Sequence, residues 1–413
     1  MQCRACLSQS VDQILDFGSW PIVHHLKQAP SDLREEHEFV VGVCKSCGLL
    51  QLVMPIDPEI LYKDYFTLSS WKNNPHIDRL IWLLTQCSGV EESSEILEIG
   101  CNDGSFLEIL KRTGYNSLYG IEPSEDAYLV AKEKKLDVEH GFFGIEKAQA
   151  VSEERGPVDL LVCRQVLEHV ADLPDFMTGL NHVLAEGAPL LLEVPDAATN
   201  IFELDYGFWE EHVNYFTENT LKSLLSTYGF RVAFTERVVF SGNTIIVLAF
   251  KDSARKTGSS VGVANAVRAT STEVDCARRM GELWSKFRLE FRSFLGEQSR
   301  ENKKTVIYGC GARSSTLANF LGLEELVHCF VDDQTEKQGY FVPGSNLQIL
   351  SADAIPLNEI DTVLLGVNAE NEEKVMKKLS LKQSEARCYS ILAPSRHLPR
   401  FWQKLIFEHI SGG

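Results

Sequence analysis

Short apolar runs alternate with segments of helical periodicity through the middle of the chain. The apolar runs lie at residues 95–99, 118–122, 158–164 and 190–194, and helical segments follow near residues 105, 125, 173 and 219. Runs of this length are typical of strands buried in a parallel sheet. Residues 230–239 and 243–251, joined by Ser241 and Gly242, predict a closing antiparallel pair. We therefore expect a mostly parallel, doubly wound α/β sheet.

The flanking segments follow different patterns. Residues 1–75 predict short strands and turns, and a helix over 75–87 leads into the first central strand. The polar stretch 251–260 is typical of a linker. A long helix over 272–300 is predicted by apolar side chains at i, i+4 spacing: Leu283, Phe287, Phe291 and Leu295. Strands at 304–308, 327–332 and 361–367 then indicate a second Rossmann-like α/β unit.

Length and charge narrow the class of protein. The 413 residues are too many for one ordinary domain, and we expect three, at 1–75, 76–252 and 253–413. A formal net charge of −18 argues against binding to nucleic acid, which requires neutralisation of phosphates. Because the chain starts without a leader-like segment and contains no apolar run of about 20 residues, we expect a cytoplasmic protein without membrane contact. Either a monomer or a homodimer is consistent with this composition.

Four of the eleven cysteines form two C-x-x-C pairs. Cys3 and Cys6 make the first pair, and Cys44 and Cys47 make the second. Two such pairs can complete a closed tetrahedral thiolate shell for a structural zinc ion. Reduced cysteines or disulfides are the alternative. We expect the zinc-binding domain to act as a lid or a platform for the substrate.

The loop after the first central strand carries candidate ligand-binding groups. Residues 97–104 read Leu-Glu-Ile-Gly-Cys-Asn-Asp-Gly, and Glu122 follows about 20 residues later, where a ribose-binding acid is expected. The loop is not G-x-G-x-x-G, and the Asp103 carboxylate would repel a pyrophosphate. A cationic nucleoside without phosphate, S-adenosylmethionine, fits better. The alternative is that the glycines only form a tight turn.

The residues predicted to bind this cofactor come from three segments. Turn amides and carboxylates would hold its amino acid part, the Glu122 carboxylate its ribose, and an aromatic ring its adenine. The set is Glu98, Gly100, Asn102, Asp103, Gly104, Glu122 and Phe143.

Two later segments carry ionisable clusters near predicted strand ends. One is residues 167–170, Leu-Glu-His-Val, and the other is residues 209–216, Trp-Glu-Glu-His-Val-Asn-Tyr-Phe. His212 beside Glu211 can act as a general base, and Trp209 and Tyr215 can wall a pocket. The alternatives are a His169 at a helix start that only hydrogen-bonds the loop, and a Glu211–His212 pair on a solvated approach to a helix.

Taken together, these motifs resemble the three-domain nucleotide-sugar C-methyltransferases of deoxysugar biosynthesis over nearly the whole chain. The matching segments are residues 3–6, 15–18, 44–52, 61–65, 97–104, 120–124, 167–170, 193–195, 331–333, 337–339 and 343–344. The resemblance implies a class I, Rossmann-like methyltransferase sheet between a zinc-binding domain and a C-terminal α/β domain.

The resemblance also implies a reaction. A base removes the proton beside the ketone of a 4-keto deoxysugar nucleotide, and the enolate attacks the methyl group of S-adenosylmethionine. His212 matches the base and Glu211 its neighbouring acid. His169 and Tyr65 match pocket residues that polarise the ketone and place the sugar.

The C-terminal unit has its own glycine loop, at residues 309–312. Such a loop can hold a phosphate on helix amides, with Arg313 and Lys337 contacting the diphosphate of the sugar nucleotide. The alternative is a degenerate Rossmann unit that only packs against the rest of the chain.

Three positions depart from the family pattern. Trp209 stands for a tyrosine, Glu210 for a histidine and Thr67 for an aromatic residue. These departures leave two alternatives. One is O- or N-methylation of another small acceptor, and the other is a non-catalytic, zinc-bearing scaffold. The sequence does not indicate which sugar or nucleotide is used.

Overall fold

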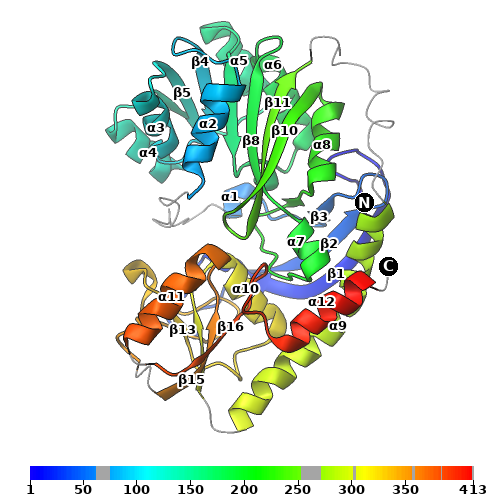
Figure 1. The fold of residues 1–413 in the computed structure, drawn as a ribbon, viewed down its shortest axis with the longest axis vertical. Helices are drawn as coiled ribbons and strands as arrows, with labels where there is room; N and C mark the ends of the chain where they lie inside the picture. Colours follow the sequence, from blue (N-terminus) through cyan, green and yellow to red (C-terminus); the bar gives the residue numbers. More distant parts are fainter. Residues whose placement is uncertain (62–74, 253–270, 301–303, 356–358, 383, 412–413) are drawn as a thin grey trace.

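Three sheets organise the computed structural model, which describes residues 1–61, 75–252, 271–300, 304–355, 359–382 and 384–411. Figure 1 shows the largest sheet in the upper half and a smaller one in the lower half, with the N-terminal strands between them on one side. Tyr65, Thr67 and most of the predicted linker lie outside the described residues. No described helix is long and apolar enough to cross a membrane.

The central sheet has seven strands in the order β10-β11-β8-β7-β4-β5-β6. Their bounds are β4 Glu95–Ile99, β5 Ser117–Glu122, β6 Val138–His140, β7 Leu160–Arg164, β8 Pro189–Pro195, β10 Phe230–Val239 and β11 Asn243–Lys251. The first five in chain order are parallel, and β11 pairs antiparallel with both β8 and β10. The predicted class I methyltransferase sheet is therefore confirmed. The direction of winding reverses between β4 and β7, where open α/β sheets bind ligands.

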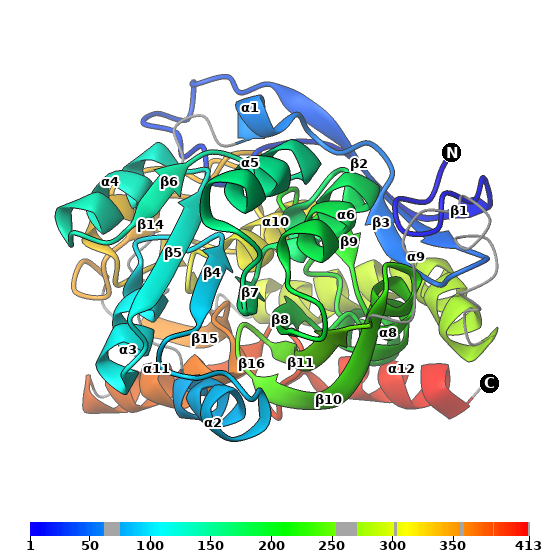
Figure 2. The same ribbon diagram turned by 90° about the horizontal axis from the view of Figure 1, so that it is seen from above.

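Helices cover both faces of this sheet (Figure 2). They are α2 Ile77–Cys87, α3 Ser105–Thr113, α4 Glu125–Glu133, α5 Ile145–Arg155, α6 Leu173–Val183 and α8 Glu218–Thr227. α2 and α3 pack with Ile96 and Val162 on one face, whereas α5, α6 and α8 pack with Leu97 and Cys163 on the other. The helix α5 and the three-residue strand β6 were not predicted, because their apolar positions are few.

The N-terminal sheet corrects the expectation of short strands. β1 Val11–Pro21 and β2 Glu36–Cys44 form a long antiparallel hairpin, followed by β3 Leu50–Leu52 and the single-turn helix α1 Pro58–Leu61. Two register shifts in β1 interrupt its alternation of inward and outward side chains, which hides its length in the sequence. The fourth strand of this sheet, β9 Asn214–Tyr215, comes from the central part of the chain.

The C-terminal sheet is parallel throughout, in the order β14-β13-β12-β15-β16. Its strands are β12 Lys304–Tyr308, β13 Phe330–Val331, β14 Ile349–Leu350, β15 Ile360–Leu365 and β16 Arg387–Ser390, with helices α10 Ala312–Leu321 and α11 Ala369–Leu381. This arrangement confirms the second Rossmann-like unit, although β13 is shorter than predicted.

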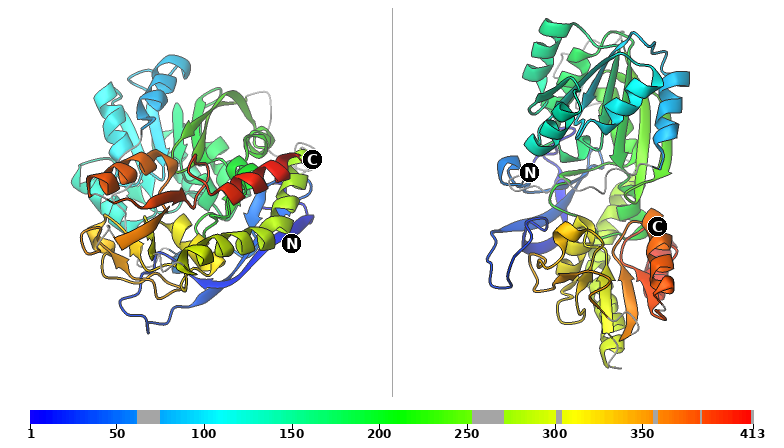
Figure 3. Two further views of the ribbon diagram at one scale, coloured as in Figure 1. Left: turned by 60° about the horizontal axis from the view of Figure 1, so that its bottom comes forward. Right: turned by 90° about the vertical axis from the view of Figure 1, so that its left-hand side faces the viewer.

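Three more helices connect the parts: α7 Ala198–Glu203, α9 Ser271–Arg300 and α12 Arg400–Ser411. α9 packs against both β1 and β12. The left view of Figure 3 shows this long yellow-green helix beside the blue N-terminal strands. One apolar core therefore joins the N-terminal sheet to the C-terminal domain. Within it the Phe17 and Phe320 rings stack with centroids 4.0 Å apart.

Candidate functional site

The four cysteines of the two C-x-x-C pairs converge on one point. Each offers a sulfur, and all four sulfurs lie within 4.8 Å of one another. Cys3 Sγ and Cys47 Sγ are 3.4 Å apart, and Cys6 Sγ and Cys44 Sγ are 3.6 Å apart. Both separations are far longer than a disulfide bond of about 2.0 Å. They approach the roughly 3.8 Å edge of a tetrahedron with Zn–S bonds of about 2.3 Å, so the donor set fits zinc.

The glycine loop after β4 is shaped by close packing. A Cβ on Gly100 would lie 2.4 Å from Val166 Cγ2, and one on Gly104 would lie 2.1 Å from Leu136 Cδ1. Both glycines also have positive φ, at +68° and +74°, which other residues rarely adopt. These glycines therefore form the tight turn of the alternative interpretation. The turn also brings the loop against Val166, which leads into the Glu168–His169 segment.

Glu98 and Glu122 lie in neighbouring strands beside this loop. Glu98 Oε2 is buried and has no hydrogen-bond partner in the described part of the chain. Burial raises the pKa of Glu98 to about 8. Glu122 accepts hydrogen bonds of 2.8 Å from the backbone N–H groups of Asn102 and Ser124. S-adenosylmethionine requires one acid for its ammonium group and a second acid for its ribose. Glu98, whose Oε2 lacks a partner among the described residues, and Glu122 supply these two groups, so the site fits this cofactor.

Other residues predicted to bind the cofactor have structural partners. Asp103 pairs with Lys134 at 3.1 Å and accepts a hydrogen bond from the Ser105 backbone at the start of α3. Phe143 makes an edge contact with Phe176, with ring centroids 5.4 Å apart. Asn102 has a φ of +50°, a conformation that is uncommon outside glycine and is often found at functional turns.

The structure brings the two predicted ionisable segments together. Glu168 and His169 lie in a 3₁₀ turn, η2 Leu167–His169, directly after β7. The backbone N–H of Val213 donates to the carbonyl of Glu168 at 2.8 Å, and Asn214 Nδ2 donates to the carbonyls of Leu167 and Val170. The segment 209–216 is thus fastened across the carboxyl end of β7.

His212 is enclosed by rings. Its centroid lies 3.6 Å from that of Trp209 and 4.7 Å from that of His169, whose ring is nearly perpendicular. Only 4% of His212 is exposed. Burial, with the nearby charges of His169 and Arg313, holds the pKa of His212 well below its usual value. The imidazole is therefore neutral at physiological pH, and one of its two ring nitrogens carries no proton.

Glu211 has a partner that the sequence did not indicate. Its carboxylate pairs at 3.1 Å with His24 Nδ1, from the N-terminal domain. Burial opposes protonation of His24, but Glu211 and Glu210 together raise its pKa. The carboxylate that lies with the ring nitrogens of His169 and His212, all within 4.8 Å, belongs to Glu168.

A second buried network, missed by the sequence analysis, is centred on Glu193 at the end of β8. Its carboxylate pairs with His76 at 3.1 Å and with Arg164 at 3.0 Å, and it accepts a hydrogen bond from Gln165. Although burial opposes ionisation, Arg164 and His76 hold the pKa of Glu193 at about 2. The sequence held one signal for this network. Glu193 lies at a strand end, in the segment 193–195 that matches the family.

The two cations predicted to bind a diphosphate contact protein groups. Arg313 pairs with Asp205 and donates to the Ala393 carbonyl at 2.9 Å and to Asn368 Oδ1 at 3.1 Å. Lys337 Nζ donates to the Cys310 carbonyl at 2.7 Å. The remaining predicted substrate residue, Tyr215, has its hydroxyl 3.1 Å from both the backbone nitrogen and the carbonyl oxygen of Trp209.

Comparison with known proteins accounts for this arrangement. Consecutive parts of the chain match family models for a zinc binding domain (residues 3–62), a methyltransferase domain (76–233) and a C-methyltransferase C-terminal domain (241–389). The chain belongs to the three-domain methyltransferase family. It is a methyltransferase that depends on S-adenosylmethionine, with a zinc site in its N-terminal domain.

The chain is similar to individual known proteins to different extents. The chain is 25% identical over 361 residues to the C-methyltransferase NovU of Streptomyces niveus, a match covering 85% of this chain and 86% of that protein. A shorter match, 30% identical over 105 residues, relates 24% of this chain to 40% of the ubiquinone biosynthesis O-methyltransferase of Caulobacter sp. (strain K31). Among solved structures, magnesium protoporphyrin IX methyltransferase of Synechocystis PCC 6803 with bound S-adenosylmethionine has a TM-score of 0.35 and 17% identity, over 48% of this chain and 98% of that one.

Proposed function

We propose that this methyltransferase transfers its methyl group to a carbon atom beside the ketone of a 4-keto deoxysugar nucleotide. The single observation that carries the proposal is the enclosed position of the His212 ring. This ring is a buried, neutral imidazole at the carboxyl end of the central sheet, held between the Trp209 and His169 rings. A general base for carbon acids needs this protonation state and a site from which water is excluded.

The choice of carbon as acceptor is supported by two comparisons. The C-terminal domain matches a C-methyltransferase model, and the relative that covers most of the chain is a C-methyltransferase. The sugar nucleotide is supported by the family resemblance of the sequence alone.

In the proposed reaction His212 accepts the proton from the carbon beside the ketone, and the electron pair of that C–H bond remains on the substrate as an enolate. S-adenosylmethionine supplies an electrophilic methyl group. His169 would hydrogen-bond the ketone oxygen and stabilise the charge that develops there. Glu98 would hold the ammonium group of the cofactor, and Glu122 its ribose.

Trp209 changes how this site can work. An indole N–H donates hydrogen bonds but cannot accept or relay a proton as a phenol can. Proton transfer in this chain therefore falls to His212, and the Trp209 face covers its ring.

The test is incubation with labelled S-adenosylmethionine and a panel of keto nucleotide sugars, analysed by mass spectrometry. We expect one methyl group on carbon, and deuterium from solvent in the keto sugar when the cofactor is withheld. His212→Asn should lower turnover by about 10²–10⁴-fold with cofactor affinity near wild type. Methylation of oxygen or nitrogen without deuterium exchange would contradict the proposal.

A further inference from the structure

Glu168 is a buried acid whose carboxylate lacks, among the described residues, the hydrogen bonds that usually offset the cost of burial. Only 1% of the residue is exposed, and neither Oε1 nor Oε2 has a hydrogen-bond partner among the residues that the structure describes. Burial of a carboxylate without partners costs several kcal/mol. Such a group is therefore expected to have a role that involves its neighbours.

Those neighbours are the two histidines of the site. A Glu168 oxygen, a His169 ring nitrogen and a His212 ring nitrogen all lie within 4.8 Å of one another. The backbone N–H of Val213 donates a hydrogen bond of 2.8 Å to the Glu168 carbonyl, which holds the two segments side by side. A small rotation of the Glu168 side chain, or one bridging water, would connect them.

The other ionisable groups around this cluster come from several elements. Cys163 lies on β7, Glu193 on β8, Tyr215 on β9 and Arg313 on α10, and Glu211 faces His169. Glu211 is committed to His24 and Glu193 to Arg164 and His76. Glu168 is therefore the acid best placed to serve His212.

We propose that Glu168 is the positioning residue of His212, and that it accepts from the imidazole a proton equivalent to the one removed from the substrate. This inference rests on the proposed function. His212 takes the substrate proton on one ring nitrogen, and the N–H bond on its other nitrogen breaks as an O–H bond forms on Glu168. The imidazole is neutral again, and Glu168 later returns its proton to solvent through the same ring.

This assignment has a consequence for pH. Burial raises the pKa of Glu168 well above its usual value, so the group accepts a proton from His212 only where the pH is high enough to ionise it. Turnover should rise with pH as Glu168 ionises. An acid that only filled space would affect the rate without affecting its pH dependence.

The first experiment measures the pH profile of Glu168→Gln, which keeps the size of the side chain. We expect turnover to be about 10²-fold lower at pH 8. The fall of turnover at acid pH should move to lower pH in Glu168→Gln, and Glu168→Asp should return it part of the way to its wild-type position. Glu203→Gln is the matched control, because Glu203 is another acid whose pKa burial raises, to about 6, but it lies on α7. An unchanged limb in Glu168→Gln would overturn the proposal.

The second experiment needs no substrate. Nitrogen NMR of the full-length protein reports the tautomer of His212, and we expect one tautomer in the wild type and a changed or mixed one in Glu168→Gln. This signal separates the two hypotheses: failure to methylate any keto sugar with the tautomer shift present would contradict only the proposed function. An unaffected His212 signal would overturn the role of Glu168.

The third measurement concerns a cation. The same three side chains could hold a divalent ion, so metal content should be measured in wild type and in Glu168→Gln. We expect the same single zinc per chain in both. Loss of a second bound metal ion in the variant would overturn the proton-transfer role in favour of a metal site.

Discussion

The guanidinium of Arg4 donates a hydrogen bond of 3.1 Å to the carbonyl oxygen of Val213, the residue that follows His212. A second Arg4 nitrogen donates to the Leu52 carbonyl at 2.6 Å, and the Leu52 N–H donates to Val213 at 3.0 Å. Arg4 is the second residue of the first C-x-x-C pair. The zinc-binding loop is thereby joined directly to the segment that carries the proposed base.

Replacement of Arg4 by glutamine should loosen that segment while zinc stays bound. Hydrogen bonds to charged groups contribute about 1.5–3 kcal/mol each, and Arg4 is partly buried, so we expect a lower melting temperature and a lower kcat. Lys45→Gln is the matched control, because Lys45 occupies the same place in the second pair and is half exposed beside Asp12. Equal effects of the two substitutions would contradict the role of Arg4.

Removal of zinc should be detected in the segment 209–216. Because β9 pairs with β3, and β3 follows the second cysteine pair, loss of the thiolate shell should speed amide exchange at both strands. Hydrogen exchange with mass spectrometry on chelator-treated protein, or on Cys47→Ser, measures this. The distant β12 should exchange at its normal rate. Unaltered exchange at 209–216 would show that the zinc site is independent of the loop.

Binding of S-adenosylmethionine should release close to one proton at pH 7. Burial outweighs the nearby charge of Arg164 and holds the pKa of Glu98 at about 8 without the cofactor, so the group is mostly protonated and an ammonium group must ionise it. Calorimetry in two buffers of different ionisation enthalpy measures this release, which Glu98→Gln should abolish. Glu108→Gln, on the partly exposed side of α3, should behave as wild type. A binding heat that is independent of the buffer would contradict the assignment of Glu98.

The raised pKa of Glu98 also makes the free energy of unfolding depend on pH. Between pH 4.5 and 8 the folded protein keeps a proton on Glu98 that the unfolded chain has lost, so Glu98 lowers stability as pH rises through this window.

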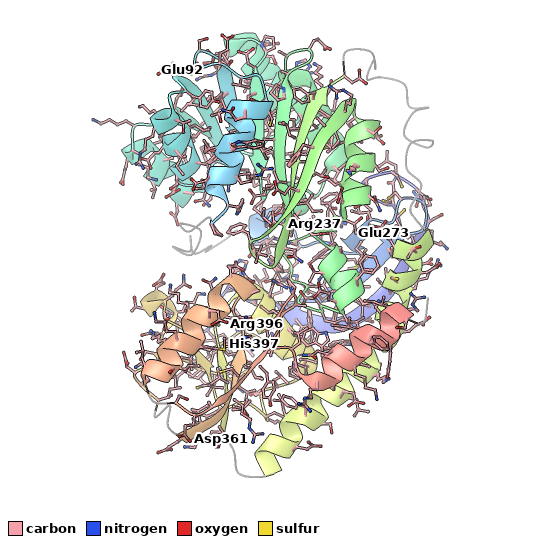
Figure 4. The ribbon with its side chains drawn as sticks, viewed as in Figure 1. Glu92, Arg237, Glu273, Asp361, Arg396 and His397 are labelled. Carbon is pink, nitrogen blue, oxygen red and sulfur yellow. The ribbon has the colours of Figure 1, made fainter. Side chains whose placement is uncertain are left out.

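Replacement of Arg313 by methionine should destabilise the contact between the central and C-terminal domains. Asp205, only 1% exposed, would be left as an uncompensated buried charge, which costs about 3–5 kcal/mol. Chemical unfolding measures the loss, and Asp205→Asn in the same chain should recover part of it. Arg396, labelled in Figure 4, pairs with Glu373 on the surface, and its replacement should cost about 0–1 kcal/mol. Weaker binding of nucleotide sugar with unchanged stability would instead support the predicted contact of Arg313 with a diphosphate.

The central domain was predictable because its signals are local. β4, β10, β11 and β12 have the predicted bounds. β4 and β12 are short, mostly apolar runs, as is typical of strands buried between helices, and the Ser241–Gly242 turn marks the antiparallel pair β10 and β11. The long strand β1 was not found, because its bulges break the period of two on which such a prediction depends.

The sequence by itself predicted the order of the three domains, the four cysteines that converge and the two acids beside the glycine loop, because each is encoded within a short stretch of chain. The tertiary structure decided which groups face one another: His24 with Glu211, Glu168 with His212, and Arg313 with Asp205. These pairs join residues that are tens to hundreds of positions apart. Their contact depends on how sheets and helices pack, and no local period or spacing records that packing.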